Sequence, residues 1–236
     1  MGPVTDRGGR LLTVPRFEGV PWLVHGFGTR EWKEGDFSSD LRLKSFRLVV
    51  MNQVHSDVAH VLRELPGRRL DGDALVTARP GLLLTVKTAD CLPVLLVDTG
   101  KKAVAAVHCG WRSTHKRILG RVVEILGKEF GSNPADILAA FGPCIGPACY
   151  EVGEDVRNLF EASGFPVQVL KARPGARGKF LLDLRRANAW VLEEAGLKAE
   201  NILSVERCTH CDPRLLSYRR DKDKDDRMFN FIGLIT

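Results

Sequence analysis

The chain has no apolar stretch long enough to cross a membrane. Its longest apolar run extends from Leu82 to Val97 and is interrupted by Lys87, Asp90 and Pro93, whereas a membrane helix needs about 20 mostly apolar residues. The first residues also lack the apolar core of a secretory signal. We therefore expect a cytoplasmic protein without a membrane partner.

Proline is scarce and low-complexity segments and internal repeats are missing. Only 12 of the 236 residues are Pro, while 44% are hydrophobic and 27% are charged, as in an ordinary globular protein. A chain of this length can bury a sizeable core. Because no shift in composition marks a boundary, we predict one domain over residues 1–236.

Charge of one sign is not concentrated in any segment. The net charge of +6 arises from 35 Lys and Arg against 29 Asp and Glu, and the one dense run, 218–227, alternates in sign. Alternation is typical of a solvated loop and not of a nucleic-acid-binding stripe. We expect no nucleic-acid partner, and a basic chain suits a small anionic substrate. The oligomeric state is not predicted.

Strand and helix patterns are mixed along the chain without the regular alternation and Gly-rich first turn of a dinucleotide-binding fold, which favours the α+β class. Helical spacing of apolar residues predicts a helix over Thr114–Leu126, with Ser113 or Thr114 as N-cap and Gly127 as its end. Further helices are predicted over Glu154–Ala162 and Asp183–Ala195. Strands are predicted over Phe46–Met51, Leu82–Val86, Val94–Val97, Ala103–Val107, Ile137–Phe141, Ile202–Val205 and Met228–Ile235.

Three residues of metal-binding type stand at or just past the ends of predicted buried strands: His55, Cys91 and His108. Two imidazoles and a thiolate are ligands that zinc accepts, with a fourth position left for water or substrate. The spacing leaves two alternatives open. In the first alternative, Cys91 is a buried cysteine that behaves as a small hydrophobic residue, and the two histidines are hydrogen-bonded. In the second, His108 meets Cys91 across a hairpin and activates its thiolate for acyl or amide chemistry.

The other cysteines form two pairs, Cys144 with Cys149 and Cys208 with Cys211, which together could build a structural zinc site. The first pair lies in a Pro-Gly turn, and nothing in the sequence brings the pairs together, so a shared site is the less favoured interpretation. Cys109 directly follows His108, points to the opposite face of a continuing strand and is interpreted as a small buried residue.

Several arginines flank these motifs and could hold an anionic substrate by bidentate hydrogen bonds. Arg112 is favoured because Gly110-Trp111-Arg112 places it between a strand end and a helix N-terminus, where anions are stabilised. Arg30 and Arg219 are weaker candidates, and Gln53 completes the predicted substrate-binding residues. Asp90, next to Cys91, is a candidate acid or base, or a residue that orients a ligand.

A series of motifs resembles one family over nearly the whole chain, from about residue 25 to the C-terminus. In order, they are His25-Gly-Phe-Gly-Thr-Arg30, Asn52-Gln-Val-His-Ser-Asp57, Asp71-Gly-Asp-Ala-Leu-Val76, Thr88-Ala-Asp-Cys-Leu-Pro-Val94, Ala106-Val-His-Cys-Gly-Trp-Arg112, Gly142-Pro-Cys-Ile-Gly146, Cys149-Tyr-Glu-Val152 and Ser217-Tyr-Arg-Arg-Asp221. These motifs resemble those of the YfiH or laccase-domain family. Its members are described as zinc-dependent purine nucleoside phosphorylases, formerly as polyphenol oxidases, and in some bacteria as peptidoglycan editing factors.

The resemblance implies a metal site made by His55, Cys91 and His108, with zinc as the cofactor. It implies phosphorolysis of adenosine, inosine and S-methyl-5'-thioadenosine to ribose 1-phosphate or its methylthio analogue, with adenosine deaminase as a side activity. The implied fold is a layered α/β/β/α arrangement with mixed sheets, similar to the catalytic domain of the deamidating cytotoxic necrotizing factor toxin. Cys109, Ser113 and the short segment 31–51 depart from the family pattern.

Two other enzyme classes remain as alternatives. A Cys91–His108 thiol hydrolase or amidase acting on a peptidoglycan precursor would need no metal. Copper oxidase activity has less support, because six His are too few for the coppers of a laccase-type site. A single Cu²⁺ exchanged into the zinc site would give only weak polyphenol oxidation, since Cu²⁺ competes well for nitrogen and sulfur ligands.

Overall fold

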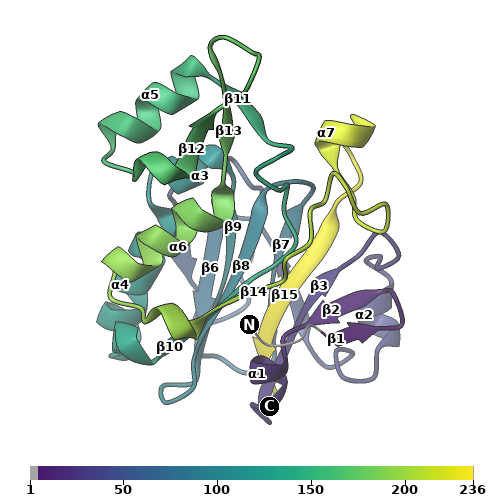
Figure 1. The fold of residues 1–236 in the computed structure, drawn as a ribbon. Helices are drawn as coiled ribbons and strands as arrows, with labels where there is room; N and C mark the ends of the chain where they lie inside the picture. The colour runs from purple at the N-terminus through teal and green to yellow at the C-terminus, as the bar shows by residue number, and fades with distance from the viewer. Residues whose placement is uncertain (1–4, 236) are drawn as a thin grey trace.

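The protein is described by a computed structural model that covers residues 5–235, and two six-stranded sheets form its centre (Figure 1). The first sheet has the order β1 (Thr5–Arg7), β2 (Leu11–Thr13), β3 (Leu23–Gly28), β15 (Met228–Leu234), β7 (Leu82–Thr88), β4 (Arg47–Val50). The second has the order β14 (Ile202–Ser204), β10 (Ile137–Phe141), β8 (Leu92–Asp98), β9 (Ala103–Cys109), β6 (Ala74–Thr77), β5 (Ala59–Val61). Both sheets mix parallel and antiparallel pairs.

The remaining strands and the helices lie around these sheets. A small third sheet has the order β11 (Glu151–Gly153), β13 (Lys179–Leu182), β12 (Leu170–Ala172). The α-helices are α1 (Pro15–Glu18), α2 (Asp36–Ser39), α3 (Trp111–His115), α4 (Ile118–Phe130), α5 (Glu154–Ala162), α6 (Leu184–Glu194) and α7 (Tyr218–Asp221). Short 3₁₀ turns cover Pro134–Asp136, Val167–Val169 and Ala199–Asn201.

The layers follow from the alternation of side chains along each strand. In β9, Ala105 and Val107 pack with the apolar faces of α4 and α6, while Val104 and Ala106 pack against the first sheet. On the outer face of the first sheet, Phe37 of α2 packs with Phe229 and other buried residues. This arrangement confirms the predicted α+β class and its layering, whereas the similarity to the toxin stays a prediction.

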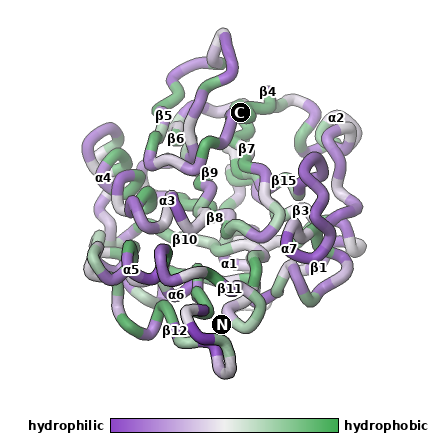
Figure 2. Tube along the Cα trace, turned by 90° about the horizontal axis from the view of Figure 1, so that it is seen from above, coloured by the Kyte–Doolittle hydropathy of each residue, from purple (hydrophilic) through white to green (hydrophobic). Residues whose placement is uncertain are grey.

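Apolar residues concentrate in the central strands, and the peripheral loops are mainly hydrophilic (Figure 2). Every residue of β8 and β9 is buried, and full burial of a Val or Leu side chain contributes about 1.5–3 kcal/mol to stability. No helix among residues 5–235 has the length and apolar character needed to span a membrane.

The predicted central strands and two of the predicted helices are confirmed, but the prediction of one helix over Thr114–Leu126 is wrong. The segment forms α3 and α4, separated where Arg117 has a φ of +58°. Neither Ser113 nor Thr114 caps a helix, because α3 already begins at Trp111. The second helix continues past Gly127 and ends at Gly131, whose φ of +70° provides the left-handed C-terminal position.

Candidate functional site

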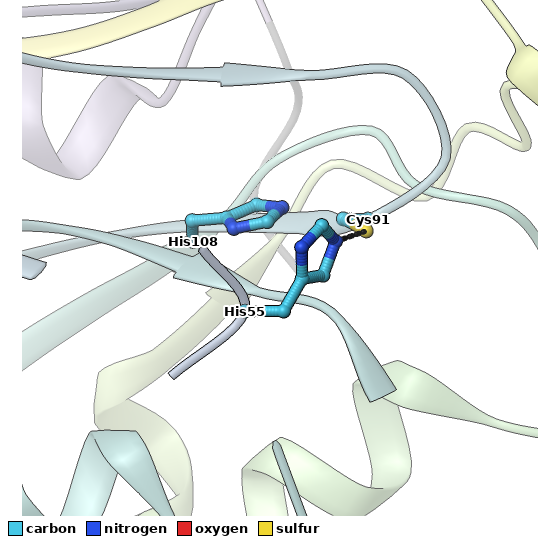
Figure 3. A group of neighbouring side chains, drawn as sticks. All are labelled: His55, Cys91 and His108. Atoms are coloured by element: carbon cyan, nitrogen blue, oxygen red, sulfur yellow. Dashed lines mark hydrogen bonds between the residues drawn. The ribbon is translucent and has the colours of Figure 1, made fainter. Parts of the chain in front are cut away.

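His55, Cys91 and His108 lie together, as Figure 3 shows, and their ligand atoms are all within 4.8 Å of one another. The Nε2 atom of His55 is 3.9 Å from the sulfur of Cys91. The two imidazole rings meet edge to face with their centroids 4.8 Å apart. Three residues that are far apart in the sequence therefore form one cluster of two nitrogen donors and one sulfur donor.

Strand ends and two unusual backbone conformations position these side chains. His108 lies in β9 opposite Pro93 of β8, while Cys91 lies in the short turn between β7 and β8. Asp90 precedes it with a φ of +92°, and His55 has a φ of +57°. Positive φ values are uncommon for residues other than glycine, although Asp and His adopt them more readily than most, and they are often found at functional sites.

Asp73, directly before β6, connects His55 and His108. Its Oδ1 accepts a hydrogen bond from Nδ1 of His108 at 2.8 Å and one from the backbone N–H of His55 at 3.1 Å. Its Oδ2 accepts from the backbone N–H of Ser56 at 2.5 Å and from its hydroxyl at 2.7 Å. Since a carboxylate only accepts, Nδ1 of His108 carries a proton, and Nε2 is the atom through which His108 would bind a metal ion after losing its own proton.

The absence of a side chain at Gly110 makes room for the cluster. A Cβ atom at this position would lie 2.8 Å from Cδ2 of His55 and 3.1 Å from the sulfur of Cys91. Both distances are shorter than ordinary van der Waals contacts. Glycine at 110 is therefore required by the close approach of the strand end to both side chains.

The charged forms of Cys91, His108 and Asp73 stabilise one another. Burial alone raises the pKa of the Cys91 thiol and lowers that of His108, but attraction between thiolate and imidazolium outweighs burial and reverses both shifts. Burial also raises the pKa of Asp73, yet hydrogen bonds from His108 and Ser56 bring it to about 2. The cluster therefore favours a thiolate at Cys91, which is the form that binds metals and acts as a nucleophile.

A pocket of about 590 Å³ opens onto the cluster, a volume typical of sites for small molecules. Four cationic residues line it against a single carboxylate, that of Asp225. The lining residues are Met51, Asn52, Gln53, His55, Arg69, Lys87, Thr88, Ala89, Cys91, His108, Tyr218, Lys224, Asp225 and Arg227. The pocket is chemically suited to a ligand that carries negative charge.

Two of the predicted site residues are occupied by hydrogen bonds that hold the backbone. The Asp90 carboxylate accepts from the hydroxyl of Thr209 at 2.6 Å and from the backbone N–H of Arg219 at 2.6 Å. The side-chain amide of Gln53 donates to the carbonyl of Lys87 at 2.8 Å and accepts from its N–H at 2.7 Å. Asp90 thus fixes the turn that carries Cys91, and Gln53 fixes the end of β7 at the pocket wall.

Within the described residues, the three predicted arginines do not line the pocket. The Arg112 guanidinium stacks on the ring of Trp111 at 4.3 Å. Arg219 lies over the ring of Tyr150 and donates to the carbonyl of Glu151. Arg30 lies 3.6 Å from Asp221.

Asp73 has no role in the predictions made from the sequence, and Arg69, Lys87 and Lys224 are not among the predicted site residues. The sequence does carry a signal for Asp73, because it stands just before a buried strand, as the three clustered residues stand at strand ends. The basic residues come from three separate segments, and only the fold brings them together.

The structure brings the two cysteine pairs together, which nothing in the sequence indicates, whereas the disfavoured four-cysteine site stays untested. Cys144 and Cys208 pair as an isolated parallel β-bridge, which brings the sulfur atoms of Cys149 and Cys211 to 3.4 Å. Cys144 itself is fully buried. Cys109 is also buried and packs on the helix side of the sheet, which confirms the interpretation made for it.

Comparison with known proteins gives matches over most of the chain. A family model described as multi-copper polyphenol oxidoreductase laccase matches residues 34–235. A purine nucleoside phosphorylase of Deinococcus radiodurans is 43% identical over 184 residues, which are 78% of this chain and 69% of that protein. Adenosine deaminase RL5 of an unknown prokaryotic organism is 42% identical over 140 residues, 59% of this chain and about half, 53%, of that relative. The crystal structure of the Bacillus licheniformis hypothetical protein YfiH has a TM-score of 0.88 and 26% identity, with 99% of this chain and 100% of that chain covered.

The fold and the site define a layered α+β protein with a candidate His-Cys-His metal centre at a basic pocket. The match over residues 34–235 shows more: the chain belongs to the laccase-domain or YfiH family. The resemblance carried by its motifs is thereby confirmed.

Proposed function

We propose that this chain is a zinc-dependent purine nucleoside phosphorylase that acts on adenosine, inosine and S-methyl-5'-thioadenosine. Its products are the free base and ribose 1-phosphate or methylthioribose 1-phosphate, and adenosine deamination is a side activity. The names of its relatives support both reactions. The observation that carries the proposal is the convergence of the His-Cys-His cluster and four cationic side chains on one pocket.

The residues present fit a zinc ion. Two imidazoles and a thiolate are a common donor set for zinc, and three protein ligands leave one position for substrate. The hydrogen bond from His108 to Asp73 is the outer contact that usually orients a ligating His. A bound zinc would supply Lewis acidity toward a substrate oxygen. In this proposal His55, Cys91 and His108 hold the ion.

The other residues of the pocket bind and orient the two substrates. Arg69, Lys87, Lys224 and Arg227 offer charge-assisted hydrogen bonds to phosphate. A phosphate oxygen forms the new bond to C1' of the pentose while the bond from C1' to the base nitrogen breaks. The electron pair of that bond leaves with the base, which takes up a proton. Holding phosphate in line with C1' is the main contribution of the cationic residues.

Two of the residues predicted from the sequence, Asp90 and Gln53, act by positioning their neighbours. Asp90 orients the turn of Cys91 and, through the backbone of Arg219, the start of α7. Gln53 holds Lys87 at the pocket wall through the Lys87 backbone. Arg112, Arg219 and Arg30 stay predicted contacts of an anionic substrate, and for them the proposal requires side-chain movement toward the pocket.

The proposal is tested by identifying products. Purified protein with zinc is incubated with inosine or adenosine, with and without phosphate, and base, pentose 1-phosphate and ammonia are quantified. Formation of equal amounts of base and pentose 1-phosphate only when phosphate is present supports phosphorolysis. Ammonia release that is independent of phosphate would instead make deamination the main reaction, and nucleoside binding without turnover would make the chain a binding protein.

A second candidate function rests on the series Cys91, His108 and Asp73, in which the ligand atoms of Cys91 and His108 lie within 4.8 Å of each other and His108 donates a hydrogen bond to Asp73. Such a series activates a thiolate for attack on an amide, so a metal-free amidase is the alternative to the phosphorylase. The amidase is expected to be inactivated by alkylation of Cys91 and to be indifferent to chelators.

A further inference from the structure

A second cluster of metal-binding side chains lies outside the pocket. It consists of Cys149, His210 and Cys211, whose ligand atoms are all within 4.8 Å of one another. The two sulfur atoms are 3.4 Å apart, and both cysteines are free thiols. Two zinc–sulfur bonds of about 2.3 Å at a tetrahedral angle place the sulfurs about 3.8 Å apart. The two sulfurs therefore need to separate by only a few tenths of an ångström to hold a zinc ion together with the imidazole nitrogen.

The backbone around this cluster is built from two tight turns. In the first, the N–H groups of Cys149 and Tyr150 both donate to the carbonyl of Gly146, at 2.9 and 3.1 Å. In the second, the N–H groups of Cys211 and Asp212 both donate to the carbonyl of Cys208, at 3.2 and 2.9 Å. The second turn carries two of the three clustered residues, His210 and Cys211, next to each other in the sequence.

Fixed contacts hold the two turns against each other. Cys208 forms a β-bridge with Cys144, and its sulfur accepts the N–H of Gly146 at 3.1 Å. The guanidinium of Arg220 in α7 donates to the carbonyls of Thr209 and His210 at 2.7 and 3.2 Å. These contacts fix the backbone of the two turns that carry the half-buried Cys149 and His210 and the exposed Cys211.

We propose that Cys149, His210 and Cys211 bind a second divalent metal ion, of the zinc class. Thiolate and imidazole together select a borderline-soft ion over calcium or magnesium. The site is separate from the His55, Cys91 and His108 centre, and the proposal does not depend on the proposed function.

The position of the site gives the ion a structural role. It ties the turn after β10 to the segment that carries Thr209, whose hydroxyl holds the Asp90 carboxylate. Asp90 belongs to the turn that carries Cys91. The backbone carbonyl of Asp90 also accepts a hydrogen bond from the N–H of Ile145 at 2.9 Å, which links this turn to the segment after β10. Loss of the ion is expected to lower the melting temperature.

The test is a count of tightly bound zinc in the full chain, purified with reductant, saturated with Zn²⁺ and dialysed. Wild-type protein is expected to retain about two ions per chain, and the Cys211→Ser and His210→Ala variants about one. The matched control Cys144→Ala removes a buried sulfur outside the cluster and is expected to keep two. In a Cys91→Ser background, Co²⁺ is expected to give a thiolate charge-transfer absorption that Cys211→Ser abolishes.

Two results would overturn the proposal. One is an equal zinc content in wild type, Cys211→Ser and His210→Ala, all shown to be folded by circular dichroism. The other is a disulfide between Cys149 and Cys211 in protein kept under reductant, detected by counting free thiols. Loss of zinc from a His108→Ala variant concerns the first site alone, so the two sites are counted independently.

Discussion

The carboxylate of Asp73 and the imidazole of His108 meet at 2.8 Å, and both side chains are almost completely buried. The same carboxylate also holds the backbone of His55. Asp73 does not line the pocket, yet it sets the orientation of two of the three proposed ligands, and the geometry of the site depends on it.

Replacing Asp73 by Asn is expected to weaken zinc binding about 10- to 100-fold, because the contacts around a ligating His contribute this much to affinity. The measurement is a competition titration with a chromophoric chelator. Asp57→Asn, at an exposed carboxylate nearby, is the control and should leave the dissociation constant unchanged. An unchanged affinity in folded Asp73→Asn protein would show that Asp73 does not support the ligands.

The Gly110→Ala variant tests the crowding of the site without altering any ligand. Its new methyl group must displace His55 or Cys91, so we expect lower zinc affinity and loss of most activity. Gly120→Ala, in α4, is the matched control, because a Cβ atom at this position would contact only Val191 of α6, at 3.7 Å. Ala in the middle of a helix is also more favourable than Gly by about 0.5–1 kcal/mol. Zinc affinity equal to that of wild type in Gly110→Ala would contradict the described approach of β9 to the site.

The KM for phosphate is expected to depend more on the cationic residues that line the pocket than on those that lie outside it. Arg227→Gln is expected to raise the KM for phosphate about 10-fold or more, because a charge-assisted hydrogen bond contributes about 1.5–3 kcal/mol. Arg112→Gln is expected to raise the KM for phosphate less, because Arg112 stacks on Trp111 and can reach phosphate only by leaving that ring. Steady-state kinetics with varied phosphate measures both. The reverse order would restore the role predicted for Arg112 from the sequence.

His25 is expected to make stability depend on pH. Its Nε2 accepts the N–H of Val14 at 2.9 Å, and burial lowers its pKa from 6.5 to about 4. At pH values between about 4 and 6.5, His25 binds a proton in the unfolded chain but not in the folded chain. The contribution of neutral His25 to the free energy of unfolding is therefore fully present above pH 6.5 and is lost as the pH decreases from 6.5 to 4. The contribution is about 3 kcal/mol.

Urea unfolding at pH 7 and pH 4.5 tests this expectation. The wild type should lose more stability between the two pH values than a His25→Gln variant, which cannot take up the proton. Equal losses in the two proteins would show that His25 is not buried in its neutral form.

The sequence is most informative where burial is complete and contacts are local. The apolar runs of β4, β7, β8 and β9 and the residue types at or just past their ends are enough to single out His55, Cys91 and His108 as candidate ligands. Their encounter depends on the register of Leu92–Asp98 against Ala103–Cys109, and spacing alone leaves two other interpretations of these residues open.

The sequence gives no signal where contacts between distant segments decide the structure. Strand β3 contains Gly26 and Gly28, which disfavour a strand in isolation but are needed because Leu11 and the carbonyl of Phe229 approach them closely. Likewise, the meeting of Cys149 and Cys211 depends on the β-bridge between Cys144 and Cys208. Such pairings between distant segments leave no periodic trace in the sequence.

The most direct test of the central claim is pentose 1-phosphate formation from inosine and phosphate before and after chelation, with zinc counted in the same samples. The account predicts that activity is lost when the zinc held by His55, Cys91 and His108 is removed and returns when Zn²⁺ is added. It also predicts that His108→Ala lacks both that ion and the activity. Full activity in metal-free protein, abolished by alkylation of Cys91, would contradict the account and favour a thiol nucleophile.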